Sequence, residues 1–333
     1  LSSLMPAVSW MDRRAGEDIL EELRRGKEPD YHYNHTGWKL TNSFNLVQIA
    51  WLRKYRPEVF QKAAKFLSTS DYLNFRLTGE FVTDYTNAGI TNMEDITRCV
   101  WDENALNDLS IRRDQLAKLL PAGTVIGPLT DEAAEALGIP KETIVVNGGM
   151  DQYCGAVGCG ATKAGEAMLA SGTAWVVLGT FCKRLFDPQS YIAPCPHILP
   201  DRYGAMATVP TGGIAMEWFR KIFRSGLETE EETFSHIDQE ASAVPPGCDG
   251  LLFYPHFFGA TCPSWEIQNR AGFIGVHLGH RRGHFSRAVM EGVAFAANDI
   301  IHALAQSGGE VQRIKLIGGA AKSELWSRIV SDV

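Results

Sequence analysis

The sequence lacks the features that mark several common classes of protein. Its seven cysteines are odd in number and share no C-x-x-C spacing, which favours reduced thiols over a disulfide framework or a zinc site. Acidic residues outnumber basic ones, 39 to 32, and both kinds are dispersed along the chain. Because no basic field is present to attract a polyanion, we expect no nucleic-acid partner and no membrane partner. The cysteine spacing predicts no zinc site, and no side chain is singled out as a metal ligand.

Long apolar runs are missing as well. The most apolar stretch, residues 285–306, is interrupted by Arg287, Glu291, Asp299 and His302, which argues against a membrane helix. The first residues carry neither the basic segment nor the apolar core of a secretory signal, so we expect a soluble, cytoplasmic protein. The chain has no initiator Met and stops within an amphipathic pattern, so we also expect a piece of a longer protein.

What the sequence does contain is an alternation of helical and strand patterns. Apolar residues recur at helical spacing and predict helices near residues 15–23, 44–51, 70–77, 102–120, 130–138 and 284–306. Short apolar runs predict strands at 143–146, 167–170, 175–178, 251–254 and 314–317. At 333 residues the chain is too long for one comfortable core, so we predict an α/β protein of two domains.

The stretch 145–160 contains the first candidate for chemistry. A short apolar run ends in Gly148 and Gly149, and Asp151 follows. Small residues and glycines after it allow other backbone to approach closely. A carboxylate at the rim of a sheet can act as a general base, but Asp after Gly more often caps a turn. The local sequence leaves both interpretations open.

Two glycine-containing turns are candidates for phosphate binding. Residues 171–174 form the tip of a predicted hairpin, and Gly318 and Gly319 lie between a strand and a helix, where free backbone N–H groups would form an anion site. A tight turn of an α/β domain is the alternative, and the motif G-x-x-x-x-G-K-[ST] occurs nowhere in the chain. A carboxylate and two such turns suit phosphoryl transfer to a hydroxyl group.

Five motifs, in order along the chain, resemble those of the FGGY family of carbohydrate kinases. Residues 271–276, followed after seven residues by 284–292, are similar to the family's second signature. The other four are a W-x-D-x-R element near the sugar at 10–14, the catalytic segment at 147–152, the phosphate hairpin at 171–175 and the adenosine-side turn at 317–323. Together the motifs span essentially the whole chain.

The resemblance implies a two-domain α/β fold of the ribonuclease H-like, actin-like ATPase and hexokinase superfamily, with mixed sheets flanked by helices. Residues 1–160 would then belong to the N-terminal sugar-binding domain and residues 161–333 to the C-terminal nucleotide-binding domain. The resemblance also implies ATP and Mg²⁺ as cofactors and a sugar as the small-molecule partner. The sequence does not determine the oligomeric state, and a homodimer is one option.

The same resemblance assigns roles to individual residues. Asp151 is implied as the catalytic base and Gln152 as its sugar-side neighbour. The implied contacts to phosphate and nucleotide are Gly172, Thr173, Gly318, Gly319 and Ala320. Asp12 and Arg14 are candidate sugar contacts, and an ion pair that fixes the start of a helix is an equal alternative for them.

The chain departs from the family pattern in two places. Where the first signature is expected, Asn45 replaces the usual Pro, Ser or Thr and Gln48 replaces the usual Lys. The opening strand and D-x-G-T loop, which bind phosphate and metal in the family, have no counterpart, so we expect residues 1–333 alone to transfer phosphate poorly.

Within the second signature, we interpret Arg287 and Glu291 as an i,i+4 pair that holds the long helix in place.

The activity we expect is ATP-dependent phosphorylation of a sugar hydroxyl, with a ketopentose such as xylulose or ribulose as the acceptor. Ser43 stands where glycerol kinases carry an aromatic residue, which favours a pentulose over glycerol. The alternatives are a kinase for glycerol or another polyol, a non-catalytic relative that binds sugar or nucleotide, and a hydrolase or acetate-kinase-like phosphotransferase of the superfamily. The sequence does not name the sugar, because loop side chains set specificity.

Overall fold

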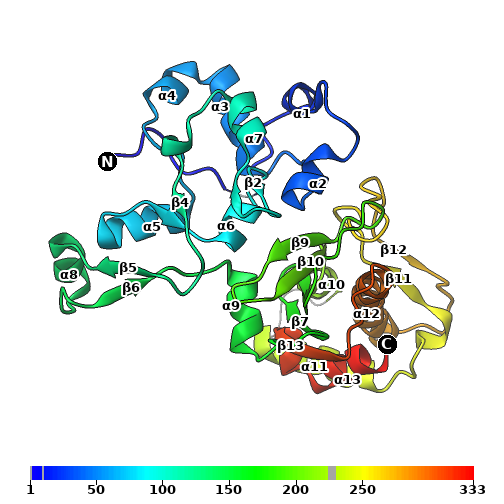
Figure 1. Cartoon of the computed structure of the whole chain (residues 1–333). Coiled ribbons are helices and arrows are strands. Elements are labelled where there is room, and N and C mark those ends of the chain that lie inside the picture. Colours follow the sequence, from blue (N-terminus) through cyan, green and yellow to red (C-terminus); the bar gives the residue numbers. More distant parts are fainter. Residues whose placement is uncertain (1, 10, 224–229) are drawn as a thin grey trace. The chain divides into compact units, whose positions relative to one another are not determined.

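A computed structural model describes residues 2–9, 11–223 and 230–333 of the chain (Figure 1). The chain divides into two compact units. Unit 1 comprises Leu1–Cys154 and Ala193–Gly204, and unit 2 comprises Gly155–Ile192 and Ala205–Val333. Each unit has a buried apolar cluster of its own, which is the usual arrangement for a chain of this length.

Helices form most of unit 1. In the first of them, Ile19, Leu20 and Leu23 are buried on one face, and the acidic residues of the first turn, Glu17 and Asp18, favour its N-terminus. The helices are α1 (Glu17–Arg24), α2 (Tyr31–Thr36), α3 (Asn45–Tyr55), α4 (Pro57–Lys62), α5 (Thr69–Thr78), α6 (Tyr85–Gly89), α7 (Glu103–Leu109), the 3-10 helix η1 (Arg113–Gln115) and α8 (Asp131–Leu137). A further helix, α9 (Asp151–Gly158), begins in unit 1 and ends in unit 2.

The strands between residues 82 and 146 of unit 1 are short and occur in pairs. β1 (Val82–Thr83) pairs in parallel with β4 (Lys118–Leu119). The antiparallel pairs are β2 (Glu94–Asp95) with β3 (Val100–Trp101), and β5 (Val125–Pro128) with β6 (Ile144–Val146). Apolar side chains of α1, α3 and α7 form the buried cluster of the unit, so its core is mainly helical.

The ends of two helices show how capping chemistry decides boundaries. The Thr130 hydroxyl caps α8 and Gly138 ends it with φ +67°, as the sequence predicts. The start of α5 differs from the prediction, because Ser68 and not Ser70 is the N-cap. The Ser68 hydroxyl accepts from the Asp71 N–H, and the Asp71 carboxylate accepts from the Ser68 N–H, which completes a capping box.

The helix predicted over residues 102–120 is wrong in its second half. α7 ends at Leu109, after which Ser110 adopts φ +56°, and the chain becomes extended at β4. The Trp101 indole N–H donates to the Ala117 carbonyl oxygen at 2.8 Å. A tertiary contact therefore holds this segment in a conformation that local periodicity does not reveal.

The largest sheet of the described residues has five strands in the order β13-β7-β8-β10-β9. These strands are β7 (Glu166–Ser171), β8 (Trp175–Phe181), β9 (Ala193–Pro196), β10 (Tyr203–Val209) and β13 (Arg313–Gly318). β7 and β8 form the predicted antiparallel hairpin, and β13 pairs in parallel with β7. Leu169 and Val177 are cross-strand partners within the core of unit 2. Met168 points to the other face, where it lies against Gly155 of α9, as the period of a strand requires.

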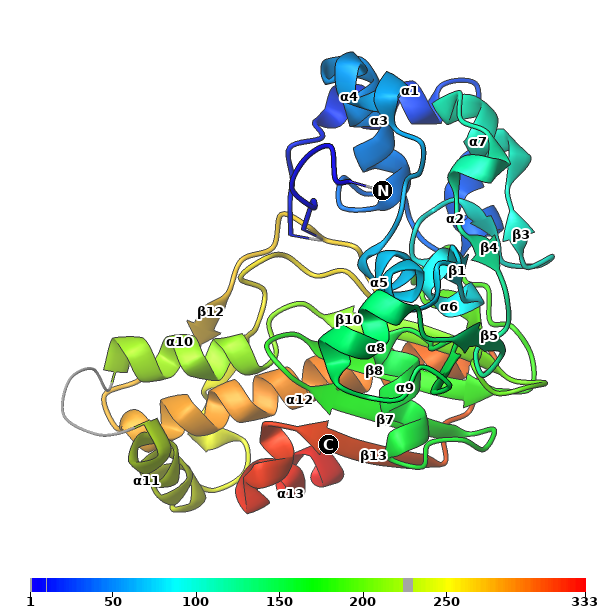
Figure 2. The ribbon, with the colours of Figure 1, turned by 90° about the vertical axis from the view of Figure 1, so that its left-hand side faces the viewer.

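Helices cover this sheet, and α12 (Arg282–Gln306) is the longest of them (Figure 2). It contacts β8, α10 (Gly213–Phe223), α11 (Glu230–Ser242) and α13 (Glu324–Asp332). The remaining elements of unit 2 are the 3-10 helices η2 (Cys248–Gly250) and η3 (Ala320–Lys322) and the antiparallel strands β11 (Leu252–Tyr254) and β12 (Gly272–Ile274). α12 is long and apolar enough to cross a membrane, a property that the core helix of a soluble protein can share. In this structure 61% of its most apolar 18-residue window is buried inside the molecule.

Candidate functional site

Asp151 is the first residue of α9, directly after β6 and two glycines. Its side chain is exposed and contacts its neighbour: the Gln152 N–H donates to Oδ1 at 2.7 Å, and the Gln152 side-chain amide lies 3.4 Å from Oδ2. The helix N-terminus favours the negative charge. The carboxylate thus satisfies a backbone N–H, as a turn residue does, and still presents oxygen to solvent, as a base must.

The turn before Asp151 is held by side chains from other parts of unit 1. The Thr86 hydroxyl accepts a hydrogen bond from the Met150 N–H at 2.8 Å. The Asn147 side-chain amide donates to the Leu120 carbonyl oxygen at 3.0 Å. A Cβ atom at Gly149 would lie 2.5 Å from a methyl carbon of Ile198, so glycine is required there. The sequence analysis did not single out Thr86, because no local pattern marks a partner this distant in the chain.

The predicted sugar contacts Asp12 and Arg14 form an ion pair, with Nη2 of Arg14 2.6 Å from Oδ2 of Asp12. Hydrogen bonds from the Arg14 side chain lower the pKa of Asp12. The Arg14 guanidinium also lies 5.2 Å from the ring centroid of Trp51. Among the described residues, no hydrogen bond or ion pair joins this pair to Asp151, and Trp10 of the same motif lies outside the described residues.

Gln48, which stands where the family's first signature usually has Lys, has a structural contact of its own. Its buried side-chain amide donates to the Asn42 carbonyl oxygen at 2.7 Å and to the Asp12 carbonyl oxygen at 3.2 Å. A neutral amide at this position therefore ties the segment that carries Asp12 to α3.

In unit 2, strand pairing brings the two predicted phosphate-side segments together. β13 lies beside β7, with Gly318 opposite Ser171. The Ser171 hydroxyl donates to the Ile317 carbonyl oxygen at 2.6 Å and accepts from the Ala320 N–H at 3.0 Å. Gly318 has φ +94°, and a Cβ there would lie 2.8 Å from the Ser171 carbonyl oxygen. Only glycine fits this close approach without strain.

The expectation of free N–H groups at residues 318–320 is wrong for two of the three. The Gly319 N–H donates to the Ser171 carbonyl oxygen at 2.9 Å, and the Ala320 N–H donates to the Ser171 hydroxyl. The helix also begins later than predicted, since η3 intervenes and Ser323 caps α13 at Glu324. Gly318 and Gly319 remain exposed, so this turn presents bare backbone surface instead of a cluster of donors.

The hairpin tip differs from that turn, because its donors are available. Gly172 and Thr173 are exposed, and their N–H groups donate to no acceptor among the described residues. Their carbonyl oxygens accept from Gly213 N–H and Ile214 N–H, each at 3.0 Å. α10 therefore begins against the hairpin, and its N-terminus adds favourable potential for an anion. The sequence analysis missed this contact, although the two glycines before the apolar helix pattern were a signal for it.

Arg287 and Glu291 form the predicted i,i+4 pair within α12, at 2.7 Å between Nε and Oε1. Both are buried. Glu291 also accepts from the Gly247 N–H at 3.2 Å and from the Cys248 thiol at 3.5 Å, and burial raises the pKa of that thiol to about 12. The pair thus fastens the 245–250 turn to the long helix and has a structural role.

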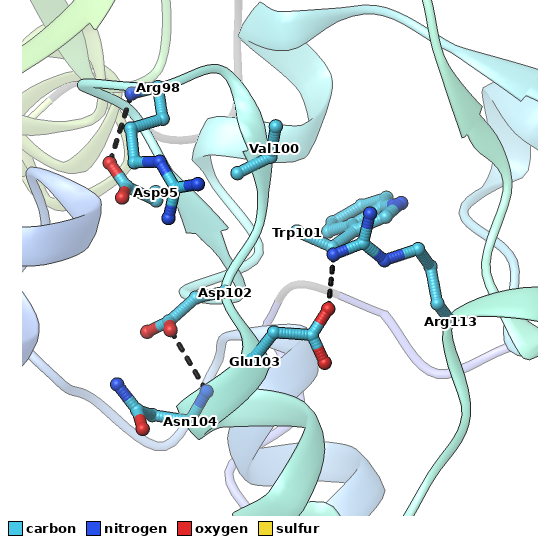
Figure 3. Close-up of a pocket in the computed structure, with 8 residues that line it drawn as sticks. All are labelled: Asp95, Arg98, Val100, Trp101, Asp102, Glu103, Asn104 and Arg113. Atoms are coloured by element: carbon cyan, nitrogen blue, oxygen red, sulfur yellow. Dashed lines mark hydrogen bonds and ion pairs between the residues drawn. The ribbon is translucent and has the colours of Figure 1, made fainter.

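A separate pocket of about 210 Å³ lies in unit 1. Figure 3 shows the residues that line it: Asp95, Arg98, Val100, Trp101, Asp102, Glu103, Asn104 and Arg113. Several of its charged groups are engaged locally, since Arg113 pairs with Glu103 and Asp102 accepts from the Asn104 N–H at 2.9 Å. None of the predicted site residues lines it. The described residues also contain no group of three or more His, Cys, Asp or Glu side chains suited to a metal ion.

Two family descriptions together match almost the whole chain. The N-terminal domain of the FGGY family of carbohydrate kinases matches residues 2–158, and the C-terminal domain of that family matches residues 167–333. The chain belongs to the FGGY family of carbohydrate kinases.

Individual relatives agree with this assignment. The chain is 34% identical over 341 residues to a gluconokinase and 30% identical over 330 residues to a xylulose kinase, both from Bacillus subtilis (strain 168), and each comparison covers 99% of this chain and 65% of the relative. The crystal structure of xylulose kinase from Rhodospirillum rubrum matches with a TM-score of 0.90 at 28% identity, over 99% of this chain and 66% of that one. The chain thus spans about 65% of the length of the curated relatives it matches. The predicted α/β fold class of mixed sheets flanked by helices is confirmed.

Proposed function

We propose that the full-length protein transfers the γ-phosphoryl group of ATP to a hydroxyl group of a sugar, with Asp151 as the general base. The observation that carries this proposal is the exposed carboxylate of Asp151 at the start of α9, directly after Met150, whose backbone N–H is held by the buried Thr86 side chain. Family membership supports it, because the catalytic segment, the hairpin and the turn are all present in this chain.

In the proposed reaction the sugar hydroxyl donates a hydrogen bond to an Asp151 oxygen. As the hydroxyl oxygen forms its bond to the γ-phosphorus, the proton passes to Asp151 and the bond from phosphorus to the β-phosphate oxygen breaks. The products are a sugar phosphate, ADP and one proton. Gln152, whose amide lies beside the carboxylate, is the proposed sugar-side neighbour, and Asp12 and Arg14 are further candidate sugar contacts.

On the nucleotide side, the proposed contacts follow the geometry of unit 2. The free N–H groups of Gly172 and Thr173 suit the oxygens of the transferred phosphate, which are acceptors only. Gly318, Gly319 and Ala320 are the proposed nucleotide contacts: Gly318 and Gly319 offer exposed backbone surface, and the buried Ala320 fixes the turn, since the Gly319 and Ala320 N–H groups are bound to Ser171. In this proposal the free N–H groups of residues 172–173 bind phosphate, and residues 318–320, which offer few free donors, contact the rest of the nucleotide.

Mg²⁺ is the proposed companion of ATP, and when bound it would neutralise phosphate charge. Protein-bound Mg²⁺ usually needs only one or two carboxylates beside the phosphates. The described residues offer no larger cluster of ligands, and Asp151 is the exposed carboxylate of the proposed site. The proposed proton transfer and the proposed contacts to sugar and nucleotide therefore involve only side chains and backbone of the protein.

A ketopentose such as xylulose or ribulose is the proposed acceptor, supported by the xylulose kinase relatives. Gluconate is the second candidate, because the gluconokinase relative has the higher identity and because Arg13 offers a cation. Arg13 donates to the neutral groups Asn42 Oδ1 at 2.8 Å and Ser43 Oγ at 3.4 Å, whereas Arg14 is paired with Asp12. An aldonate carries a carboxylate that a guanidinium can bind.

The test is ADP release by the full-length protein with xylulose, ribulose, gluconate and glycerol, together with mass spectrometry of the product. We expect one of the sugars to give both ADP and a phosphorylated product. Arg13→Gln should lower kcat/KM for gluconate about tenfold or more and leave that for xylulose within about twofold. ADP release without a phosphorylated sugar, or sugar binding without turnover, would overturn the proposal in favour of a hydrolase or a sensor.

A further inference from the structure

We propose that Asp84 and Thr86 are positioning residues for Asp151: a buried carboxylate orients a buried hydroxyl, which holds the backbone of the residue before the base. This inference rests on the proposed function, in which Asp151 accepts the proton. Neither residue contacts the carboxylate of Asp151 in any described hydrogen bond, so both act through the main chain.

The hydrogen bonds of Thr86 have a fixed direction. Its hydroxyl oxygen accepts from the Met150 N–H at 2.8 Å. The hydroxyl has one proton, which it donates to the Asp84 carboxylate. The Thr86 side chain is 1% exposed and that of Asp84 is 2% exposed, so water does not compete for either bond. The hydroxyl is therefore oriented to receive the Met150 N–H.

Asp84 is held just as firmly. Its carboxylate accepts from the N–H groups of Thr86, at 2.7 Å, and Asn87, at 3.2 Å, and also from the Asn87 side-chain amide. With the Thr86 hydroxyl, four donors converge on two oxygens. A side chain of the same shape with a donor in place of one oxygen would face these donors unfavourably, so a carboxylate is required.

The other side of the turn is also fixed. A Cβ atom at Gly149 would lie 2.5 Å from a methyl carbon of Ile198 and 3.5 Å from the Thr86 hydroxyl oxygen, so this residue is closely enclosed. After Asp151, the buried Tyr153 ring packs edge-on against His197, at 5.2 Å between ring centroids, and fills the space beside Gly204. The bond from the Met150 N–H to Thr86 is thus the side-chain contact made by the residue directly before Asp151, where α9 begins.

The consequence for catalysis follows from the contacts of Asp151 itself. Its carboxylate contacts only its neighbour Gln152 among the described residues, so its direction depends on the backbone that carries it. Displacement of a reacting group by about 1 Å can cost roughly 100-fold in rate. Loss of the Thr86 hydroxyl should therefore reduce kcat, while sugar and nucleotide still bind.

The experiment compares Thr86→Val and Thr86→Ser in the full-length protein, with Thr91→Val as the matched control. The buried Thr91 hydroxyl also accepts from a backbone N–H, that of Met93 at 3.1 Å, and donates to the Ala88 carbonyl oxygen, but it has no described contact with residues 147–151. We expect Thr86→Val to lower kcat by about 10- to 100-fold with both KM values within about twofold. Thr86→Ser should restore most of the activity, and Thr91→Val should keep it.

Hydrogen exchange at the Met150 N–H separates this inference from the proposed function. We expect exchange there to accelerate about tenfold or more in Thr86→Val or, if that variant does not fold, in Thr86→Ala, and not in Thr91→Val. Unchanged exchange, or a folded Thr86→Val with wild-type kcat, would overturn the positioning role. An equal loss of kcat in Thr91→Val would also overturn it, whereas a wild-type protein inactive on every sugar would overturn the proposed function alone.

Discussion

The turn at 147–151 in unit 1 and the hairpin at 171–174 in unit 2 are held in different ways. The hairpin at 171–174 joins two strands of a five-stranded sheet, and pairing of β13 with β7 brings the 318–320 turn beside it. The turn at 147–151 follows a strand of a two-stranded pair and depends on the side chains of Thr86 and Asn147. Main-chain pairing therefore shapes one segment, and side chains distant in sequence shape the other.

This difference predicts how each unit responds to substitution. Main-chain hydrogen bonds survive most single changes of side chain, so variants in unit 2 should act mainly on nucleotide affinity. Side-chain anchors disappear with one substitution, so variants around the turn of unit 1 should act on turnover. The following predictions test this contrast, from the largest expected effect to the smallest.

The largest effect is expected for Asp151→Asn in the full-length protein. The amide keeps the shape of the side chain but cannot accept the hydroxyl proton, so kcat should fall by about 10²- to 10⁴-fold. Asp131→Asn is the control, since Asp131 is likewise an exposed carboxylate at the first position of a helix in unit 1. Steady-state kinetics measures both, and a loss of less than about tenfold for Asp151→Asn would remove it from the role of base.

A large loss of stability without a specific loss of turnover is expected for Arg287→Met. The change leaves Glu291 buried without its cation, which costs about 3 kcal/mol of unfolding free energy. Arg328→Met is the control, because Arg328 and Glu324 form an exposed i,i+4 pair at 3.0 Å, a kind of pair that contributes little. Urea unfolding measures the difference. Equal stability of the two variants would show that the buried pair does not fasten α12.

Ser171→Ala should weaken nucleotide binding by about tenfold and change kcat little. Without the hydroxyl, the buried Ala320 N–H loses its acceptor, at a cost of roughly 1–3 kcal/mol, and the 318–320 turn is free to move. Ser286→Ala is the control, since the buried Ser286 hydroxyl bonds within its own helix, to the Gly283 carbonyl oxygen. A lower kcat with unchanged KM for ATP would contradict the assignment of this turn to the nucleotide.

The smallest expected effect is a loss of folding stability at acidic pH. Burial lowers the pKa of His32 and of His197 to about 4, both in unit 1, from an unfolded value near 6.5. Between these values the unfolded chain binds more protons, so stability falls as pH drops from 6.5 towards 4, by roughly 1–2 kcal/mol for each imidazole after allowance for solvent screening.

Urea unfolding at pH 7 and pH 5 checks this expectation in the wild type and in His197→Phe. His197 packs beside Tyr153, two residues after Asp151, so its protonation would loosen the segment behind the turn. The variant should lose less stability on acidification than the wild type. Identical losses in both would mean that His197 does not stay neutral in the folded state at pH 5.

Local patterns predicted much of the fold. Two short apolar runs predicted the hairpin of β7 and β8, and an uninterrupted helical repeat predicted the long helix α12. The capping residues Thr130 and Gly138 predicted the bounds of α8. The prediction failed at Ser110, where a left-handed residue ends α7, and at Ala117, whose carbonyl oxygen accepts from the Trp101 indole N–H. Both departures depend on tertiary context that a single sequence does not show.

The candidate site was predicted in part. The motifs led to Asp151 and to the two glycine turns, and the structure places the two turns side by side through Ser171. The occupied N–H groups of Gly319 and Ala320 were missed, because the acceptor lies about 150 positions away in the chain. Thr86 was missed for the same reason, since 64 positions separate it from Met150.

The central claim is that Asp151 in unit 1 performs chemistry while the hairpin and turn of unit 2 hold the nucleotide. Calorimetric titration of ADP into the full-length wild type, Asp151→Asn and Ser171→Ala tests this division most directly. The account predicts a Kd for Asp151→Asn within about twofold of the wild type and a Kd for Ser171→Ala about tenfold higher. The opposite pattern, with Asp151→Asn weakened and Ser171→Ala unchanged, would contradict it.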